Sequence, residues 1–332
     1  MADPKKILVI RRDNIGDLLC TTPLIRVLRD RYPKVRIDVL VNSYNEGVVR
    51  NNPDINHVYF YTKGKHREAG ENYWCVLWRR IRLFVELRQA AYDAVYVPGD
   101  KALARLGYLL KWLSPQQVFA EPEEGFSADM HEVERCCGLL VPPLDSNTPK
   151  MHLVPDPASI EAAHHALVGQ AWYQPGMRII GIHISARKVR QRWPVDRFAR
   201  LMKELHAQHG CAFVLLWSPG DENNPMHPGD DQKAAELLSQ LDGVPVLPFP
   251  TASLASLFGV LTLPDLVVCA DGGAMHVAAA LDKPLVCLFG NSDVRRWYPW
   301  GVEHRVIQPV SLDVGDISWE QVFEAAQITL NY

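Results

Sequence analysis

The sequence lacks the short motifs that mark metal-dependent and dinucleotide-dependent enzymes. None of D-x-D, H-E-x-x-H or C-x-x-C occurs in the 332 residues, and no spacing of histidine and cysteine is that of a zinc site. After the first apolar segment the loop holds one glycine, Gly16, instead of G-x-G-x-x-G, and Asp17 stands where a dinucleotide would place its pyrophosphate. The sequence therefore predicts no metal and no cofactor, and it disfavours a nicotinamide-dependent oxidoreductase.

The sequence also has no large excess of charge of one sign and no long apolar run. The 35 Lys and Arg against 38 Asp and Glu give a net charge of −3, so no overall basic field predicts a nucleic-acid partner. No apolar run is long enough to span a bilayer, and the run at 7–10 is too short for a signal peptide. The seven cysteines form no redox motif, which favours a reducing cytoplasm. We expect any work at a membrane to be peripheral.

Short buried strands alternate with amphipathic helices in both halves of the chain. In the first half we expect strands at 7–10, 35–41, 57–61, 93–97 and 116–120, and helices at 17–31, 44–51, 71–91, 101–112 and 130–140. In the second half we expect strands at 178–184, 211–217, 244–249, 266–270 and 285–289, and helices at 196–208, 232–241, 253–261 and 318–330.

This alternation predicts an α/β protein with two Rossmann-like domains, whose parallel sheets face a central cleft. Proline-rich, non-periodic sequence at 141–157 marks a linker. We therefore expect an N-terminal domain at 1–155 and a C-terminal domain at 156–317. The last helix, within 318–332, could pack on either domain.

The stretch at 266–293 predicts a buried strand, a glycine turn, a helix and a second buried strand. Asp271, Gly272 and Gly273 form the turn, where the backbone can approach a ligand and the following helix presents free N–H groups. Such a turn suits an anion. The plain alternative is an ordinary turn in which Asp271 caps the helix.

A basic loop follows the strand expected at 178–184. Its four cations, within six residues, are Arg187, Lys188, Arg190 and Arg192. Loops at the carboxyl ends of parallel strands face the ligand crevice, so this loop, with Ser185, should share an edge with the turn at Asp271. Together they predict a diphosphate site, in which cations and helix N–H groups replace a metal. The alternative is a solvated basic loop.

Two aspartates lie in the first loop between strand and helix. Asp17, at the expected helix start, has two readings: an N-cap with a structural role, or a general base that faces an acceptor hydroxyl. Asp13 is the weaker candidate for the base.

Basic and aromatic residues are interleaved at 63–82. The cations that could bind an acidic, amphiphilic acceptor or an anionic membrane surface are Lys63, Lys65, Arg67, Arg79 and Arg80, and Trp74 and Trp78 lie among them. The alternative is an exposed basic helix face with buried tryptophans.

Taken in order, these segments resemble the bacterial lipopolysaccharide heptosyltransferases of glycosyltransferase family nine. The resemblance lies in residues 7–17 with Thr22-Pro23, in Arg192-Trp193-Pro194 with Arg197-Phe198, and in the run from Asp271 to His276 with Pro284 and Gly290. It implies a GT-B fold, an ADP-heptose donor on the C-terminal half, an acidic lipopolysaccharide inner-core acceptor on the N-terminal half, and inverting, metal-independent transfer at the inner membrane.

The resemblance also assigns roles to residues. It makes Asp17 the base, places Ser185 near the diphosphate and Glu222 near the ribose, and puts Asp271, Gly272, Gly273 and His276 in a second donor loop. Two positions depart from the family: Gln191 stands where a lysine is usual, and Ala186 replaces a second hydroxyl. Arg190 or Arg192 should then take over the phosphate contact. Another nucleotide sugar, or a sugar-nucleotide-binding paralogue without turnover, remains an alternative.

Overall fold

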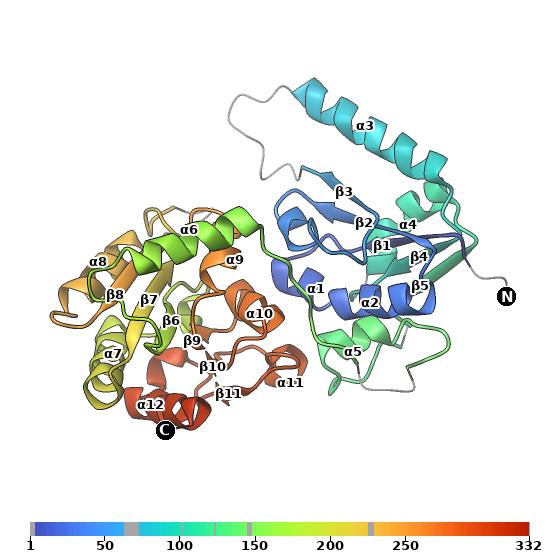
Figure 1. Ribbon diagram of the computed structural model, residues 1–332. Helices are drawn as coiled ribbons and strands as arrows, with labels where there is room; N and C mark the ends of the chain where they lie inside the picture. Colours follow the sequence, from blue (N-terminus) through green and yellow to red (C-terminus); the bar gives the residue numbers. More distant parts are fainter. Residues whose placement is uncertain are drawn as a thin grey trace. The chain divides into compact units, whose positions relative to one another are not determined.

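The computed structural model describes residues 4–62, 73–100, 102–122, 124–144, 148–224 and 229–331. The chain divides into two compact units, Met1–Val154 and Pro155–Tyr332. Each unit is an α/β structure with its own sheet, of five strands in the first and six in the second, and every strand pair is parallel (Figure 1).

The first sheet has the order β3-β2-β1-β4-β5. Its strands are β1 (Lys6–Ile10), β2 (Arg36–Asn42), β3 (His57–Tyr61), β4 (Ala94–Val97) and β5 (Gln117–Ala120). Leu8, Ile10 and Leu40 form a core with residues of α3 (Tyr73–Ala90) and α4 (Ala102–Leu113). Figure 1 shows α2 (Thr22–Arg31) and α5 (Glu132–Cys137) on the opposite face of this sheet.

The helix expected at 17–31 is in fact two helices, α1 (Ile15–Leu19) and α2. The hydroxyls of Thr21 and Thr22 donate to the carbonyls of Asp17 and Leu19, which closes the end of α1. Pro23 then lies in the first turn of α2, where its missing N–H costs nothing. The helix expected at 44–51 is also wrong, since only Glu46–Val48 forms a short 3₁₀ turn, η1.

The second sheet has the order β11-β10-β9-β6-β7-β8. Its strands are β6 (Ile179–His183), β7 (Ala212–Trp217), β8 (Val246–Pro250), β9 (Leu266–Ala270), β10 (Leu285–Leu288) and β11 (His304–Ile307). The accompanying helices are α6 (Pro157–Val168), α7 (Val195–His209), α8 (Asp231–Ser239), α9 (Leu254–Val260), α10 (Gly273–Ala280), α11 (Val294–Trp297) and α12 (Trp319–Leu330). A left-handed Gly210, with φ 64°, ends α7.

The last helix, α12, packs on the second unit. Val322, Ala326 and Leu330 are buried in the same core as Ile180 and Phe213 of the second sheet. Trp193, just before α7, is 2% exposed and donates through Nε1 to the carbonyl of Ile317, just before α12. This answers the question that the sequence left open.

None of the helices in the described part of the chain has the combined length and apolar character needed to cross a bilayer.

Candidate functional site

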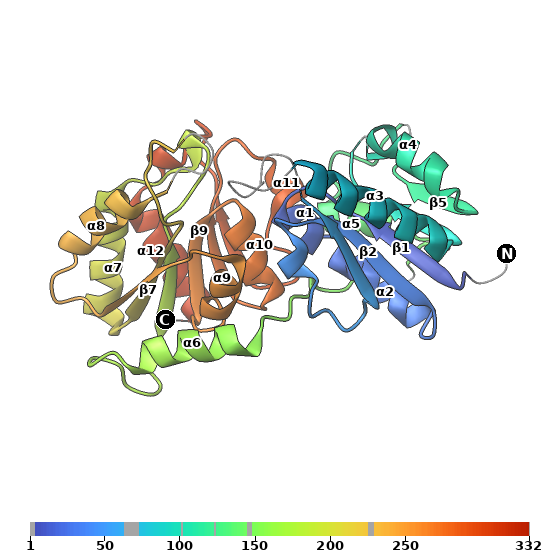
Figure 2. The same cartoon turned by 90° about the horizontal axis from the view of Figure 1, so that it is seen from above.

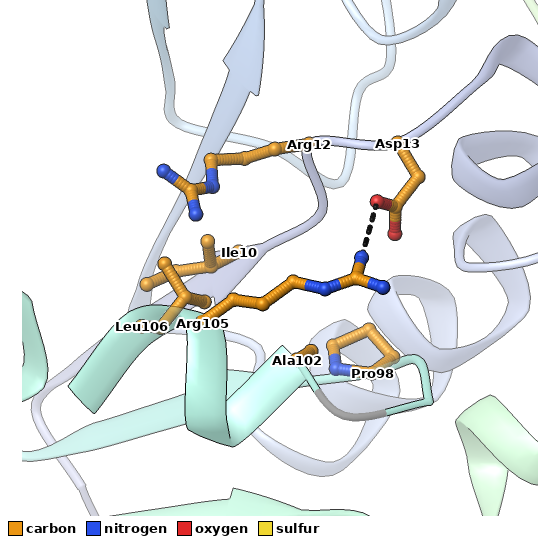
Figure 3. Close-up of a pocket in the computed structure, with 7 residues that line it drawn as sticks. All are labelled: Ile10, Arg12, Asp13, Pro98, Ala102, Arg105 and Leu106. Carbon is orange, nitrogen blue, oxygen red and sulfur yellow. Dashed lines mark ion pairs between the residues drawn. The ribbon is translucent and has the colours of Figure 1, made fainter.

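The strand order of the first sheet reverses beside β1. The chain runs outward from β1 through β2 to β3 and then returns to β4 on the other side. Ligands of open α/β sheets bind at the carboxyl ends of the strands at such a point. A pocket lies there, lined by Ile10, Arg12, Asp13, Pro98, Ala102, Arg105 and Leu106 (Figure 3).

A buried arginine, Arg11, organises this edge. It is 2% exposed, and its Nη2 lies 2.7 Å from Oδ1 of Asp17 and 2.7 Å from Oε1 of Glu132 on α5. Its Nε lies 3.3 Å from Oδ2 of Asp13. Gly99 makes room for the guanidinium, because a Cβ at this position, where φ is +113°, would lie 2.9 Å from Nη1.

Asp17 is held in one orientation at the third position of α1. Its Oδ1 accepts from Arg11, and its Oδ2 accepts from the backbone N and the Nδ2 of Asn14, both at 3.0 Å. Asn14, rather than Asp17, is the N-cap of α1, so the N-cap reading of Asp17 is wrong. Asp17 instead takes the acidic position of a capping box and keeps 15% of its side chain exposed.

The environment keeps Asp17 ionised at neutral pH. Burial alone would raise the pKa of this carboxyl, but the charge of Arg11 and the hydrogen bonds from Arg11 and Asn14 outweigh it and lower the pKa. Asp17 can therefore accept a proton, and part of its side chain is open to solvent.

Asp13 is more open than Asp17 and lies on the pocket. Its side chain is 37% exposed and is paired with Arg11 and, at 3.8 Å, with Nη1 of Arg105 from α4. Figure 3 shows Arg105 reaching toward the Asp13 carboxylate.

Two of the expected acceptor cations, Arg79 and Arg80, are exposed on α3. The others, Lys63, Lys65 and Arg67, lie outside the described residues. The alternative with buried tryptophans is wrong, because Trp74 and Trp78 are 64% and 68% exposed.

The second sheet reverses its strand order between β6 and β9. The basic loop follows β6, and the turn at Asp271 follows β9. Gln191, at the end of a 3₁₀ turn, η3 (Val189–Gln191), is 5% exposed and donates through Nε2 to Oδ2 of Asp271 at 2.9 Å and to Oγ of Ser292 at 3.2 Å. One buried amide thus ties together the two loops of the expected diphosphate site.

The cations of the basic loop differ in exposure and in hydrogen bonding. Arg187, Lys188 and Arg190 are exposed, whereas Arg192 is half-buried and donates through Nε to the carbonyl of Ala186 at 3.1 Å. The backbone of this loop lies against Gly290, and a Cβ at Gly290 would lie 2.7 Å from the carbonyl oxygen of Arg190. The loop is therefore fixed in its backbone while three side chains extend from it.

The remaining expected donor residues fall in three places. The hydroxyl of Ser185 accepts from the backbone N of Ser218 at 2.8 Å, which joins the ends of β6 and β7. Gly272 and Gly273 start α10, whose His276 is 4% exposed with its ring 5.9 Å from that of Trp297. Glu222 is exposed in the loop after β7.

The chain is similar in sequence to known glycosyltransferases. The model of glycosyltransferase family 9 (heptosyltransferase) matches residues 119–313. The chain belongs to glycosyltransferase family 9. It is 27% identical to lipopolysaccharide heptosyltransferase 3 of Escherichia coli over 313 residues, which cover 86% of this chain and 83% of that protein.

Solved structures show that this family 9 enzyme has the GT-B fold of heptosyltransferases. A glycosyl transferase of family 9 from Veillonella parvula has a TM-score of 0.79 at 19% identity, over 98% of this chain and 97% of that one. The Escherichia coli heptosyltransferase WaaC, solved with ADP, has a TM-score of 0.75 at 20% identity, over 98% and 99%. At these identities the likeness concerns the fold.

Sequence reasoning missed several polar groups of this glycosyltransferase. Glu132 is one, because it meets Arg11 across 121 positions of sequence. Asp231 accepts from Nε1 of Trp217 at 2.7 Å and from the backbone N of Gly220 at 2.9 Å. A carboxylate in the first turn of a helix after a strand is a signal that could have indicated it.

Lys233 is another missed group, and its amine lies at the end of β6. Its Nζ donates to the carbonyl of Ile184 at 3.0 Å. Burial lowers the pKa of Lys233 to about 8. Burial and the nearby Lys233 charge lower the pKa of His183 to about 4, so that imidazole is neutral at physiological pH.

Arg11→Gln tests the buried cluster. It should lower the free energy of unfolding at neutral pH by about 3–5 kcal/mol, because Asp17 and Glu132 lose their cation. Since the folded-state pKa of Asp17 lies below its ordinary 3.8, its contribution is full above that pH and is lost as pH falls through the lower folded value. The deficit should therefore shrink at acid pH.

Denaturant unfolding from neutral pH to below the ordinary carboxyl range measures this difference. Arg11→Lys is the matched control, because it keeps the positive charge but not the planar guanidinium. It should lower the free energy of unfolding less than Arg11→Gln does. A deficit that is the same at all pH values would contradict the electrostatic cause.

Proposed function

We propose that this family 9 glycosyltransferase moves a heptose from ADP-heptose to an acidic inner-core sugar of lipopolysaccharide, with inversion and without a metal ion. The second unit would hold the donor, and the first unit the acceptor. The observation that carries the proposal is the ionised Asp17, fixed by Arg11 at the strand-order reversal of the first sheet. The name of the curated relative and the ADP bound by a structural neighbour support the choice of donor and acceptor.

The reaction is one displacement at the anomeric carbon. The acceptor hydroxyl forms the new C–O bond while the bond from carbon to the diphosphate oxygen breaks, and Asp17 takes the hydroxyl proton. Attack from the face opposite the diphosphate inverts the anomeric centre. The leaving ADP carries away the electron pair, and its negative charge needs stabilisation.

The second unit can supply that stabilisation from its own groups. Arg190 and Lys188 extend from the basic loop, and the N–H groups at the start of α10 lie beside Asp271 and Gly272. A Cβ at Gly272 would meet nothing within 4 Å, so the backbone there is open to a ligand. Gln191 is engaged with Asp271, so we assign the phosphate role to Arg190.

The acceptor carries lipid, so we place the enzyme at the cytoplasmic face of the inner membrane as a peripheral protein. The pocket beside Asp13 and the cations Arg12 and Arg105 fit an acidic sugar.

Arg190→Ala tests the donor site. ADP should bind the wild type, and the variant should lose about 1.5–3 kcal/mol of affinity with the loss of a charge-assisted phosphate contact. Lys203→Ala, which removes an exposed cation on α7, is the control and should bind ADP normally. Calorimetric titration measures both. Equal ADP affinity in the two variants would place the diphosphate elsewhere, and binding of NADH in place of ADP would contradict the glycosyltransferase proposal.

Asp17→Asn tests the base. The amide keeps the size of the side chain and can still accept from Arg11, and Glu132 remains as a carboxylate partner of that cation, so the variant should melt at a lower temperature but still fold. Its ADP affinity should survive while transfer falls about 10²- to 10⁴-fold. Asp13→Asn is the comparison, and its transfer rate should fall far less. The rate of heptose transfer from ADP-heptose measures the difference.

Two results would go against the assignment. Near-normal transfer by a folded Asp17→Asn protein would end the role of Asp17 and move attention to Asp13. A wild type that binds ADP-heptose without any transfer would indicate a sugar-nucleotide-binding paralogue.

A further inference from the structure

Helix α3 is apolar on two opposite faces. Leu83 and Leu87 are 8% and 0% exposed and pack into the core of the first unit. Four other apolar side chains follow the spacing i, i+4, i+7 and i+11, which places them on one stripe of the helix. They are Trp74, Trp78, Ile81 and Val85, with 64%, 68%, 44% and 40% of their surface exposed. The core of this unit accounts for the first face only.

Helix α4, which lies beside α3, also carries exposed aromatic side chains. Tyr108 and Trp112, one turn apart, are 93% and 54% exposed. The two helices are neighbours, because Nε1 of Trp112 donates to the carbonyl of Phe84 at 3.4 Å and Nη1 of Arg88 donates to that of Leu113 at 2.6 Å. Figure 2 shows both helices on one side of the first sheet. We call this surface the α3–α4 face: Trp74, Trp78, Ile81, Val85, Tyr108 and Trp112.

The two helices that bear this face are strongly basic. Their cations are Arg79, Arg80, Arg82, Arg88, Arg105 and Lys111, and their one carboxylate is Glu86. The whole chain, by contrast, has a net charge of −3. Positive charge is therefore concentrated around the exposed aromatic side chains.

We propose that the α3–α4 face docks on an anionic lipid bilayer. Tryptophan and tyrosine prefer the boundary between head groups and acyl chains, and neighbouring arginines and lysines are attracted to anionic lipid. A second copy of this chain is a poorer occupant, because pairing the face with itself would bring two basic surfaces together.

The face lies close to the pocket of the first unit. The guanidinium groups of Arg80 on α3 and Arg12 after β1 lie 5.5 Å and 5.6 Å from the ring centre of Tyr61. Arg105 on α4 pairs with Asp13. Docking would thus bring the pocket next to the head groups of the bilayer. The acceptor sugars of the proposed function, on which this step rests, would lie there.

Vesicle binding by the full chain tests the proposal. Wild type should co-sediment with phosphatidylcholine vesicles that contain phosphatidylglycerol, bind pure phosphatidylcholine less, and dissociate as salt rises. Trp78→Ser combined with Ile81→Ser should lower the partition coefficient about tenfold or more, because two apolar side chains no longer enter the bilayer.

The matched control removes two exposed apolar side chains from the second unit. Val168→Ser combined with Ile328→Ser, at sites 41% and 46% exposed on α6 and α12, should leave vesicle binding unchanged. Melting temperature and ADP affinity should match wild type in both double variants, since all four side chains are exposed.

Three outcomes would overturn the proposal: no vesicle binding by wild type, equal binding to both kinds of vesicle, or normal binding by the Trp78 and Ile81 variant. If the wild type instead dimerises without binding vesicles, and this variant abolishes the dimer, the partner of the face is a second copy of the chain and not the bilayer.

Transfer to a lipid-free acceptor separates this proposal from the enzymatic one. Intact transfer with failed vesicle binding rejects the docking face alone, and the reverse pattern rejects the enzymatic function alone.

Discussion

The first unit depends on how it neutralises one buried charge. Arg11 is almost completely buried, and a guanidinium in such a place is tolerated only when carboxylates surround it. Asp17 and Glu132 each lie 2.7 Å from its Nη2, and they come from α1 and α5, elements far apart in the sequence. The same contacts that make this charge tolerable fix the orientation of Asp17 and keep it ionised.

A similar device recurs in the second unit, with a neutral amide in place of the guanidinium. There the loop after β6 sends the buried amide of Gln191 to Asp271, at the end of β9. In both units a polar side chain from the loop at the strand-order reversal holds a carboxylate of the candidate site. Two sheets of the same kind thus orient two different segments, one that carries Asp17 and one that carries the cations of the basic loop.

The sequence predicts every strand except β11, because most parallel strands are buried and read as short apolar runs, whereas β11 is a partly exposed strand at the sheet edge. The break between two successive helices is harder to predict. Nothing in the periodicity of 17–31 indicates that the hydroxyls of Thr21 and Thr22 end α1. The contact between Arg11 and Glu132 depends on tertiary structure and could not be read from spacing. Motif order did predict the family, since the identity of a loop residue such as Asp271 reflects function more than packing.

The solvent-facing side of α3 shows a further limit of pattern reading. Interleaved cations and tryptophans at 63–82 were compatible with buried or exposed rings, because α3 has apolar residues on both sides. Only the structure identifies Leu83 and Leu87 as the buried set.

The central claim, that Arg11 keeps Asp17 ionised and able to accept a proton, can be measured at the carboxyl group itself. A carbon-13 NMR titration of wild type, with Asp17→Asn to assign the signal, reports the pKa of that one side chain. The account predicts a pKa below the ordinary 3.8, with no titration near neutrality. A carboxyl signal that titrates close to pH 7 would contradict it, because Asp17 would then be largely protonated at the pH at which the proposed mechanism requires a carboxylate.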